Sequence, residues 1–210
     1  MCGYIRGTSG RRLERFFDTR TWREDPQPPD FARADMMWAA VSPDDRILAA
    51  LYGDGTVAWW DRWETASAKR LARKERHFAS NDGYLDFSPD SRLLGGSARD
   101  GATTIWDIAT GRIVTAMRAN FRAVHGVAFS PDGQRLLSGG EAPKDVVRLL
   151  DLGSQRHVAT LAGVPDQFWF LQMSADGNTL VAAGLKGTTL LWRAPSWEEI
   201  EAAEQKHEGP

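Results

Sequence analysis

The stretch Val127-Ala128-Phe129-Ser130-Pro131-Asp132-Gly133 decides the fold, because related stretches recur at nearly constant intervals along the chain. In each copy an apolar run enters a turn, and the four turns begin at Ser42, Ser88, Ser130 and Ser174. These serines are 46, 42 and 44 residues apart. A second phrase, such as Trp60-Asp61 or Trp106-Asp107, follows each serine after 18 to 20 residues. Two motifs that recur together at nearly constant spacing in four copies indicate an internal repeat.

Each repeat is predicted to contain four short strands. In the third repeat we expect strands at 124–130, 135–138, 146–152 and 157–161. Pro131 presets φ and Gly133 tolerates a positive φ, so the chain reverses between the first two of these strands. Short strands at this spacing are typical of an all-β sandwich, barrel or propeller. A period of 42 to 46 residues with a Trp-Asp phrase favours the propeller.

The repeat resembles that of the WD-repeat (WD40) family. The matching residues are Phe87-Ser88-Pro89-Asp90 with Thr104-Ile105-Trp106-Asp107, together with the stretch 127–133. The resemblance covers roughly residues 36–193 in four units. It implies an all-β, WD40-type β-propeller built from four-stranded blades.

The resemblance also implies a set of structural residues. In the family, a Gly-His pair before the first strand and an Asp before the third strand form a hydrogen-bonded set with the Trp. The positions that match this set here are Asp54, Trp60, Asp100, Trp106 and Trp192. Lys186 stands at the Asp position of the fourth unit, Asp145 is displaced by one residue in the third, and no unit has the Gly-His pair. We therefore expect the buried polar network to be partial.

The blade pattern predicts the organisation of the whole chain. Residues 1–17 read as the third and fourth strands of a partial blade, 18–35 as a Pro-rich charged surface loop, and 36–195 as four blades. Residues 196–206 are expected to form a short helix, because Ser196 and Glu199 make a capping box. Two closures remain open: a four-bladed ring completed by the strand ending at Phe16, or an incomplete propeller. The start in mid-blade favours the incomplete propeller.

Composition and motifs exclude several functional classes. The formal net charge of the 210-residue chain is -2, which does not favour nucleic acid or a membrane as the partner. The single cysteine, Cys2, excludes an internal disulfide framework. There is neither a signal sequence nor an apolar run of about 18 residues, so a cytoplasmic protein is expected.

No catalytic constellation is found in the sequence. The four histidines form no metal-ligand pair, and no nucleophile elbow, phosphate loop or dinucleotide fingerprint is present. We therefore expect no enzyme, no catalytic residue, no metal and no cofactor. A propeller enzyme with a central-channel site remains as an alternative. It requires acidic or histidine side chains that converge at the axis.

Candidate partner-binding residues follow from the resemblance alone. The family contacts partners on the narrow face where the first strands begin, at positions five and seven residues before the turn serine and just before the turn Asp. Gly53, Gly83 and Ala123 also hold such positions, and the candidates with functional side chains are Asp35, Met37, Asn81, Arg99, His125, Gln167 and Trp169. Aromatic and charged side chains of this kind are enriched at binding hot spots. Packing between blades is an equal alternative for Trp169, and a structural role is favoured for His125.

These observations predict a non-catalytic scaffold that docks a protein or peptide. The alternative is a C-terminal sensor or docking region of a larger signalling protein, because the C-terminal tail is similar to the endings of bacterial WD-repeat proteins, some of them fused to Ser/Thr protein kinases. An open propeller would expose on the order of 400 Å² of apolar surface at each flank, so we also expect self-association.

Overall fold

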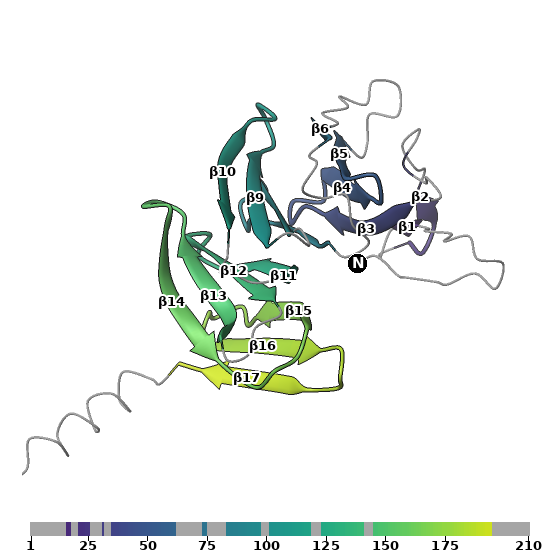
Figure 1. Cartoon of the computed structure of the whole chain (residues 1–210). Helices are drawn as coiled ribbons and strands as arrows, with labels where there is room; N and C mark the ends of the chain where they lie inside the picture. Colours follow the sequence, from purple (N-terminus) through teal and green to yellow (C-terminus); the bar gives the residue numbers. More distant parts are fainter. Residues whose placement is uncertain are drawn as a thin grey trace, which may run out of the picture.

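Four β-sheets stand side by side around an arc in the computed structural model of this chain (Figure 1). The structure describes residues 16–17, 21–25, 31, 35–61, 73–74, 83–97, 101–118, 123–140 and 145–194. Every regular element within these ranges is a strand, so the prediction of an all-β fold is confirmed. The helix predicted for residues 196–206 lies outside them.

Within each sheet the strands follow one another in chain order, and neighbouring strands are antiparallel. The first sheet contains β3 (Met36–Val41), β4 (Ile47–Tyr52), β5 (Thr56–Asp61) and β6 (Arg73–Lys74). The second contains β7 (Leu85–Phe87), β8 (Leu93–Ser97), β9 (Ala102–Asp107) and β10 (Ile113–Arg118). The third contains β11 (Val124–Phe129), β12 (Arg135–Gly140), β13 (Asp145–Asp151) and β14 (Arg156–Ala162). The fourth contains β15 (Phe168–Met173), β16 (Thr179–Gly184) and β17 (Thr189–Arg193).

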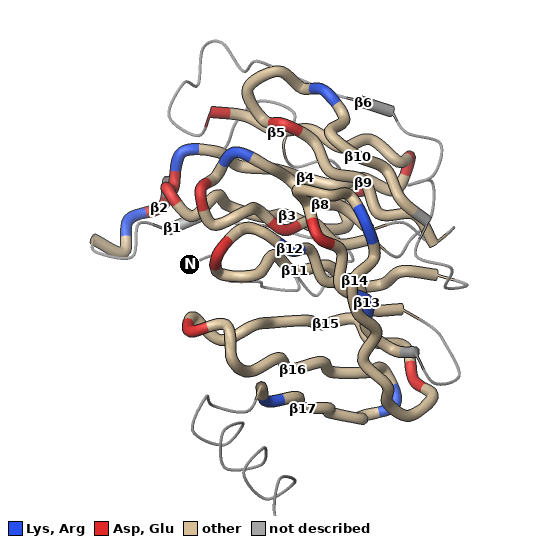
Figure 2. Tube along the Cα trace, turned by 90° about the vertical axis from the view of Figure 1, so that its left-hand side faces the viewer, with Lys and Arg blue, Asp and Glu red and all other residues tan. Residues whose placement is uncertain are grey.

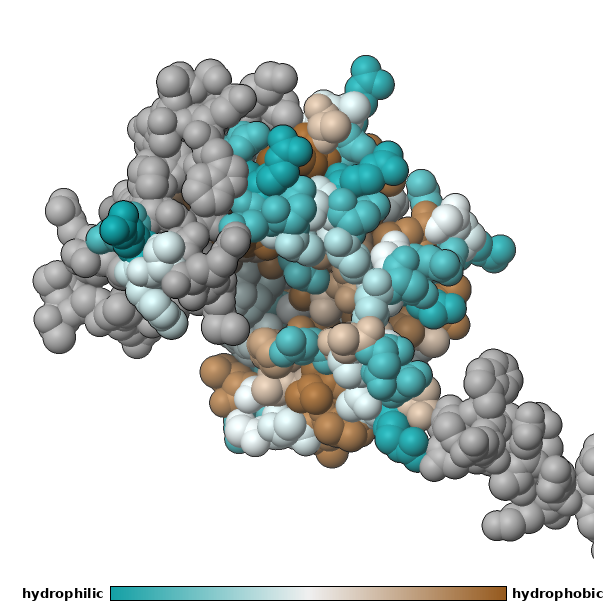
Figure 3. All heavy atoms as spheres, turned by 180° about the vertical axis from the view of Figure 1, so that it is seen from behind, coloured by the Kyte–Doolittle hydropathy of each residue, from teal (hydrophilic) through white to brown (hydrophobic). Residues whose placement is uncertain are grey.

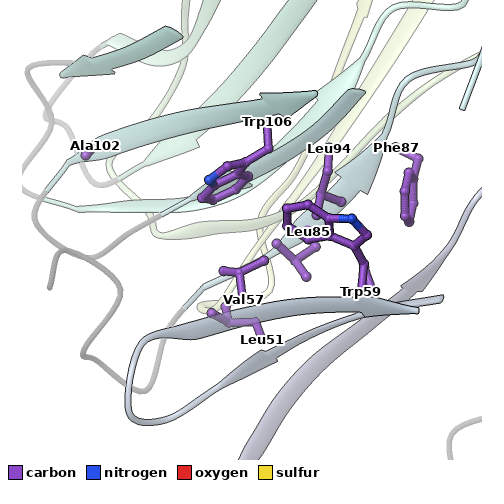
Figure 4. Packing of buried hydrophobic residues seen from close by; sticks show 9 residues of the cluster. Leu51, Val57, Trp59, Leu85, Phe87, Leu94, Ala102 and Trp106 are labelled. Carbon is purple, nitrogen blue, oxygen red and sulfur yellow. The ribbon is translucent and has the colours of Figure 1, made fainter. Parts of the chain in front are cut away.

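The first strand of each sheet lies innermost in the arc. Here β3 contacts β7, β7 contacts β11, and β11 contacts β15. Apolar side chains fill the space between neighbouring sheets, because successive residues of a strand point to opposite faces. Between the first and second sheets, Trp59 and Leu51 meet Leu85, Leu94 and Trp106 (Figure 4). Trp59 also donates from Nε1 to the carbonyl oxygen of Ile108, at 3.3 Å.

The turn after each innermost strand is built in the same way four times. In the second sheet, Ser88 Oγ donates to Asp90 Oδ1 at 2.6 Å and accepts from the amide of Leu93 at 2.9 Å. The serine hydroxyl and the amide of Arg92 lower the pKa of the Asp90 carboxyl, against the smaller opposing effect of burial. The fourth turn position has a left-handed backbone, occupied by Asp45, Ser91, Gly133 and Gly177. The turn predicted at Pro131 to Gly133 is therefore confirmed.

The N-terminal part of the described chain differs from the prediction. Strand β1 (Phe16–Phe17) pairs with β2 (Glu24–Asp25) in a separate two-stranded sheet. Residues 18–35, predicted as a loop, thus include a short strand, which ends immediately before Pro26, where a ladder donor would be missing. The closed-ring alternative placed the strand ending at Phe16 beside β17. In the described residues Phe16 pairs with Asp25 instead, and the fourth sheet has three strands.

The two ends of the arc differ in how their outer flanks are covered. On the first sheet, Phe31 is completely buried and packs its ring edge-on against Trp60, with the ring centroids 5.5 Å apart. Tyr52 Oη donates to the carbonyl oxygen of Phe31 at 2.8 Å. On the fourth sheet, Phe170 and Leu191 are 46% and 64% exposed. Apolar atoms accordingly appear on the lower part of the molecule, over the fourth sheet, in Figure 3.

Candidate binding surface along the innermost strands

A β-bulge interrupts three of the four innermost strands at the same repeat position. The pairing register shifts between Met36 and Trp38, between Val124 and Gly126, and between Phe168 and Phe170. The residues left over at these shifts are Met37, His125 and Trp169. A bulged residue has no direct partner across the ladder, and its side chain is re-aimed relative to its neighbours. Three of the positions predicted from the repeat to contact a partner therefore lie at β-bulges.

Aromatic rings form a row across the arc beside these bulges. The rings of His125 and Trp169 are stacked, with centroids 5.0 Å apart and an interplanar angle of 6°. Trp169 meets Tyr84 edge-to-face at 6.3 Å, and Tyr84 packs on Trp38 at 4.1 Å. Trp169 thus joins the second, third and fourth sheets. Edge-to-face and stacked pairs of this kind add stabilisation beyond their buried area.

Gly126 makes the close approach of the third and fourth sheets possible. A Cβ atom at this position would lie 2.9 Å from the carbonyl oxygen of Trp169. Any side chain there would push β15 away from β11. The glycine therefore keeps Trp169 close enough to stack on His125.

A cavity of about 340 Å³ lies next to this row, and each of the four innermost strands contributes to its wall. Its polar and aromatic lining includes Trp38, Tyr84, Asp86, Trp169 and Gln172. Asp86 Oδ2 accepts a hydrogen bond of 2.8 Å from the amide of Phe129, which ties the second sheet to the third. Burial raises the pKa of Asp86 to about 6, although the amides of Phe129 and Phe87 partly offset this effect.

The structure places the predicted partner-binding residues in different environments. Asp35 is exposed, whereas Met37, Gln167 and Trp169 are half-buried. His125 is 3% exposed and lies in the interior against Trp169. Asn81 and Arg99 lie outside the described residues, as does Asp100 of the structural set. Trp169 and His125 are brought together, and the binding role of all these residues stays a prediction.

The remaining residues of the structural set lie in or beside the sheets. Trp60 and Trp106 are almost completely buried. Asp54 Oδ1 accepts from the amide of Thr56 at 2.9 Å in the turn between β4 and β5. Trp192 is half-buried and donates from Nε1 to the carbonyl oxygen of Ala162 at 3.2 Å, which links the third and fourth sheets.

Asp166 supplies the carboxylate that the fourth repeat lacks at Lys186. It precedes β15, and its Oδ1 accepts from the amides of Gln167 at 2.7 Å and Lys186 at 3.1 Å. Burial opposes ionisation, but hydrogen bonds from the Thr188 hydroxyl and from these amides outweigh it and lower the pKa of Asp166. A Cβ at Gly184 would collide with this carboxylate. In the fourth repeat the accepting carboxylate therefore comes from the segment before β15, whereas Asp54 of the first repeat lies in the turn between β4 and β5.

The sequence interpretation missed Trp38, Tyr84 and Asp86. A signal for the first two was present, because each lies four residues before its turn serine. Phe170 holds the same place in the fourth repeat and Gly126 in the third, so an aromatic residue recurs in three repeats of four. Asp86 gave no periodic signal, since the equivalent residues are Ala40, Ala128 and Gln172.

Charges of both signs are interspersed along the described chain, mostly on turns and strand ends (Figure 2). In this part of the chain no three His, Cys, Asp or Glu side chains gather in a metal-binding group. Among the described residues no helix has the length and apolarity needed to cross a membrane.

Comparison with known proteins relates the chain to WD repeats. Residues 111–142, which span β10 to β12, match the family model described as "WD domain, G-beta repeat". Transducin beta-like protein 3 of Bos taurus is 31% identical over an alignment of 172 residues that covers 78% of this chain and 21% of that protein. Small ribosomal subunit protein RACK1y of Oryza sativa subsp. japonica is 30% identical over an alignment of 148 residues that covers 64% of this chain and 42% of that protein. The chain therefore spans less than half the length of either relative.

A solved structure shares the fold. The crystal structure of the computationally designed Ika4 protein matches with a TM-score of 0.64 at 21% identity, covering 80% of this chain and 96% of that chain. The match of one repeat and the two relatives show that this chain resembles WD-repeat proteins. The arc of antiparallel sheets and the designed structure support a β-propeller type of architecture.

Proposed function

We propose that the chain is a non-catalytic scaffold that docks a protein or peptide segment where its innermost strands begin. The observation that carries this proposal is the repeated β-bulge at Met37, His125 and Trp169. Bulges are over-represented at sites where a side chain is re-aimed for function. The WD-repeat relatives support an interaction scaffold over an enzyme.

The proposed mechanism is rigid display without a covalent step. Trp169 is half-buried and held between His125 and Tyr84, so little side-chain entropy remains to be lost when a partner packs against it. Asp35 and Gln167 lie beside the bulged positions and offer polar groups to a bound segment. The central-channel enzyme is disfavoured, because Asp86 is the only charged side chain among the described residues that line the cavity.

Selection from a random peptide display library tests this proposal. We expect selected peptides to bind the unmodified chain and to lose about tenfold or more of their affinity with Asp35→Lys or Trp169→Ala, as loss of a hot-spot contact does. The matched control is Gln134→Glu, an exposed substitution in the turn after β11, at the opposite end of the innermost strands. Peptides that respond only to the control substitution, or a selection that yields no binder, would contradict the proposal.

A second candidate is a docking region within a larger protein. It is favoured by the coverage of the relatives, of whose length this chain spans 21% and 42%. In that setting the same surface would recruit a partner to an activity on another part of the polypeptide. The association with a Ser/Thr kinase stays a prediction from the C-terminal tail alone.

We also retain self-association as part of the proposed function. The exposed flank of the fourth sheet supports it, because Phe170 and Leu191 are 46% and 64% exposed. A second copy of the chain is the occupant proposed for this face.

A further inference from the structure

The described residues that line the cavity beside the aromatic row include one acidic side chain and no basic one. Of the described residues that line it, Asp86 alone is charged. One carboxylate oxygen accepts from the amide of Phe129, and the amide of Phe87 also stabilises the anion. These neutral donors do not outweigh the cost of burial, which is why the pKa of Asp86 is raised to about 6. A cation placed beside the carboxylate would relieve this cost.

The wall around Asp86 is suited to a cation of one particular kind. Trp38, Tyr84 and Trp169 come from three different sheets and line the same cavity. Aromatic faces attract cations through the ring quadrupole, and the attraction grows when water is excluded. A guanidinium group is planar, weakly hydrated and able to stack on aromatic rings while it donates to a carboxylate. An ammonium group fits this combination less well, because it is compact and strongly hydrated.

We propose that this cavity binds an arginine side chain of the docked segment, with its guanidinium group paired to Asp86 and stacked against the aromatic row. The inference rests on the proposed scaffold function and adds the chemistry of one partner residue. Asp86 supplies the charge, and Trp38, Tyr84 and Trp169 supply the flat apolar surfaces.

Titration with a capped arginine tests the inference without any partner protein. The probe is N-acetyl-arginine methylamide, and its isosteric neutral control is N-acetyl-citrulline methylamide. Binding is followed by NMR on the indole N–H signals, and the nine tryptophans report different parts of the molecule. We expect the arginine probe to shift the signals of Trp38 and Trp169 and to bind about tenfold more tightly than citrulline, because only arginine is charged.

Two variants distinguish the effect of the Asp86 charge on arginine binding from a general effect on folding. Asp86→Asn keeps an oxygen acceptor for the Phe129 amide, and it is expected to reduce arginine affinity to the level of citrulline. Asp132→Asn, a turn carboxylate outside the cavity wall, should leave the preference for arginine unchanged. Equal affinity for the two probes in the unmodified chain would overturn the inference, whether or not the variants fold.

The outcomes also separate this inference from the function on which it rests. If displayed peptides bind at the bulged positions but the chain does not distinguish arginine from citrulline, the scaffold stands and the arginine site is wrong. If arginine binds at the cavity but no peptide is selected, the cation site stands and the scaffold proposal fails.

Discussion

Four residues at the inner turns adopt a left-handed backbone, with φ of 62° at Asp45, 61° at Ser91, 67° at Gly133 and 74° at Gly177. Only two of them are glycines. A side chain in this region crowds the following carbonyl group, which costs about 1–2 kcal/mol per residue. The serine and aspartate of the turn are therefore stabilising enough to hold even Asp45 and Ser91 in this conformation.

Gly133→Ala should lower the free energy of unfolding by about 1 kcal/mol, because alanine disfavours a positive φ. Space does not oppose the substitution, since the nearest atom to the new Cβ would be Pro89 Cδ at 3.7 Å. Gly153→Ala is the matched control, because Gly153 has no positive φ and its nearest atom is also 3.7 Å away. Urea unfolding of both variants checks the prediction, and equal losses of stability would contradict it.

Asp86 should make the stability of the fold depend on pH in an unusual direction. Its folded pKa of about 6 exceeds the ordinary value of 3.8, so its contribution is greatest below pH 3.8 and is lost as pH rises through 6. Asp86→Asn should therefore raise the free energy of unfolding at pH 7, by about 3 kcal/mol, and most of this gain should be lost near pH 4.

Asp132 serves as the control for Asp86, because its effect on stability changes with pH in the opposite direction. The Ser130 hydroxyl and the Gln134 amide lower the pKa of Asp132, so this carboxylate stabilises the fold at neutral pH and the stabilisation is lost as pH falls through its folded pKa. Asp132→Asn should therefore lower stability at pH 7. Unfolding curves at pH 4 and pH 7 check both variants, and a gain from Asp86→Asn that persists undiminished at pH 4 would count against the assignment.

At the level of elements, Asp166 lies before the first strand of the fourth sheet and stabilises this sheet through hydrogen bonds to two of its segments. Its carboxylate ties the segment before β15 to the turn between β16 and β17. Asp166→Ala would leave amides of both segments without this acceptor, which costs about 2 kcal/mol when such groups are buried. We expect amide hydrogen exchange to speed up in β15 to β17 more than in β11 to β14.

Asp151→Ala gives the comparison for Asp166. Asp151 accepts from the amide and hydroxyl of Ser154, but it does so within an exposed turn. Its removal should have a smaller effect, confined to β13 and β14. If the two alanine variants change exchange equally in the third and fourth sheets, Asp166 does not have the proposed role.

The strands and turns were predictable from the sequence because their signals are local. Pro131 and Gly133 mark a turn within four residues, and Trp106 is fixed in the repeat pattern by its distance from Ser88. Asp166 was missed, because it lies 20 residues from the Lys186 amide that it binds and the pairing depends on the folded sheet. The bulges at His125 and Trp169 could not be predicted from the sequence either, since a shift of register depends on the partner strand.

At the scale of the whole molecule, the two flanks of the arc are unequal. Alternate residues of β4 and β5 face outward on the first sheet, and they are buried in one cluster with Phe31. The corresponding outward face of the fourth sheet includes Phe170, Val181 and Leu191, of which Phe170 and Leu191 are exposed. Burial of such apolar area contributes about 25 cal/mol per Å², which favours association through the fourth sheet.

Leu191→Lys should weaken self-association, because a charged side chain on this face would have to lose its water when two copies pack together. Light scattering over a concentration series measures the effect. We expect the unmodified chain to increase in mass with concentration and the variant to remain near 23.3 kDa. Val114→Lys, at a 43% exposed site on β10, should leave the association unchanged. The prediction fails if both substitutions have the same effect.

The unequal flanks give the array of repeats a direction. Phe31 packs on Trp60 at the outer face of the first sheet, whereas the outer face of the fourth sheet leaves Phe170 and Leu191 exposed. New repeats added by duplication or by protein engineering would therefore find a packing partner at one end only. An added repeat would therefore extend the array from the fourth sheet and not from the first.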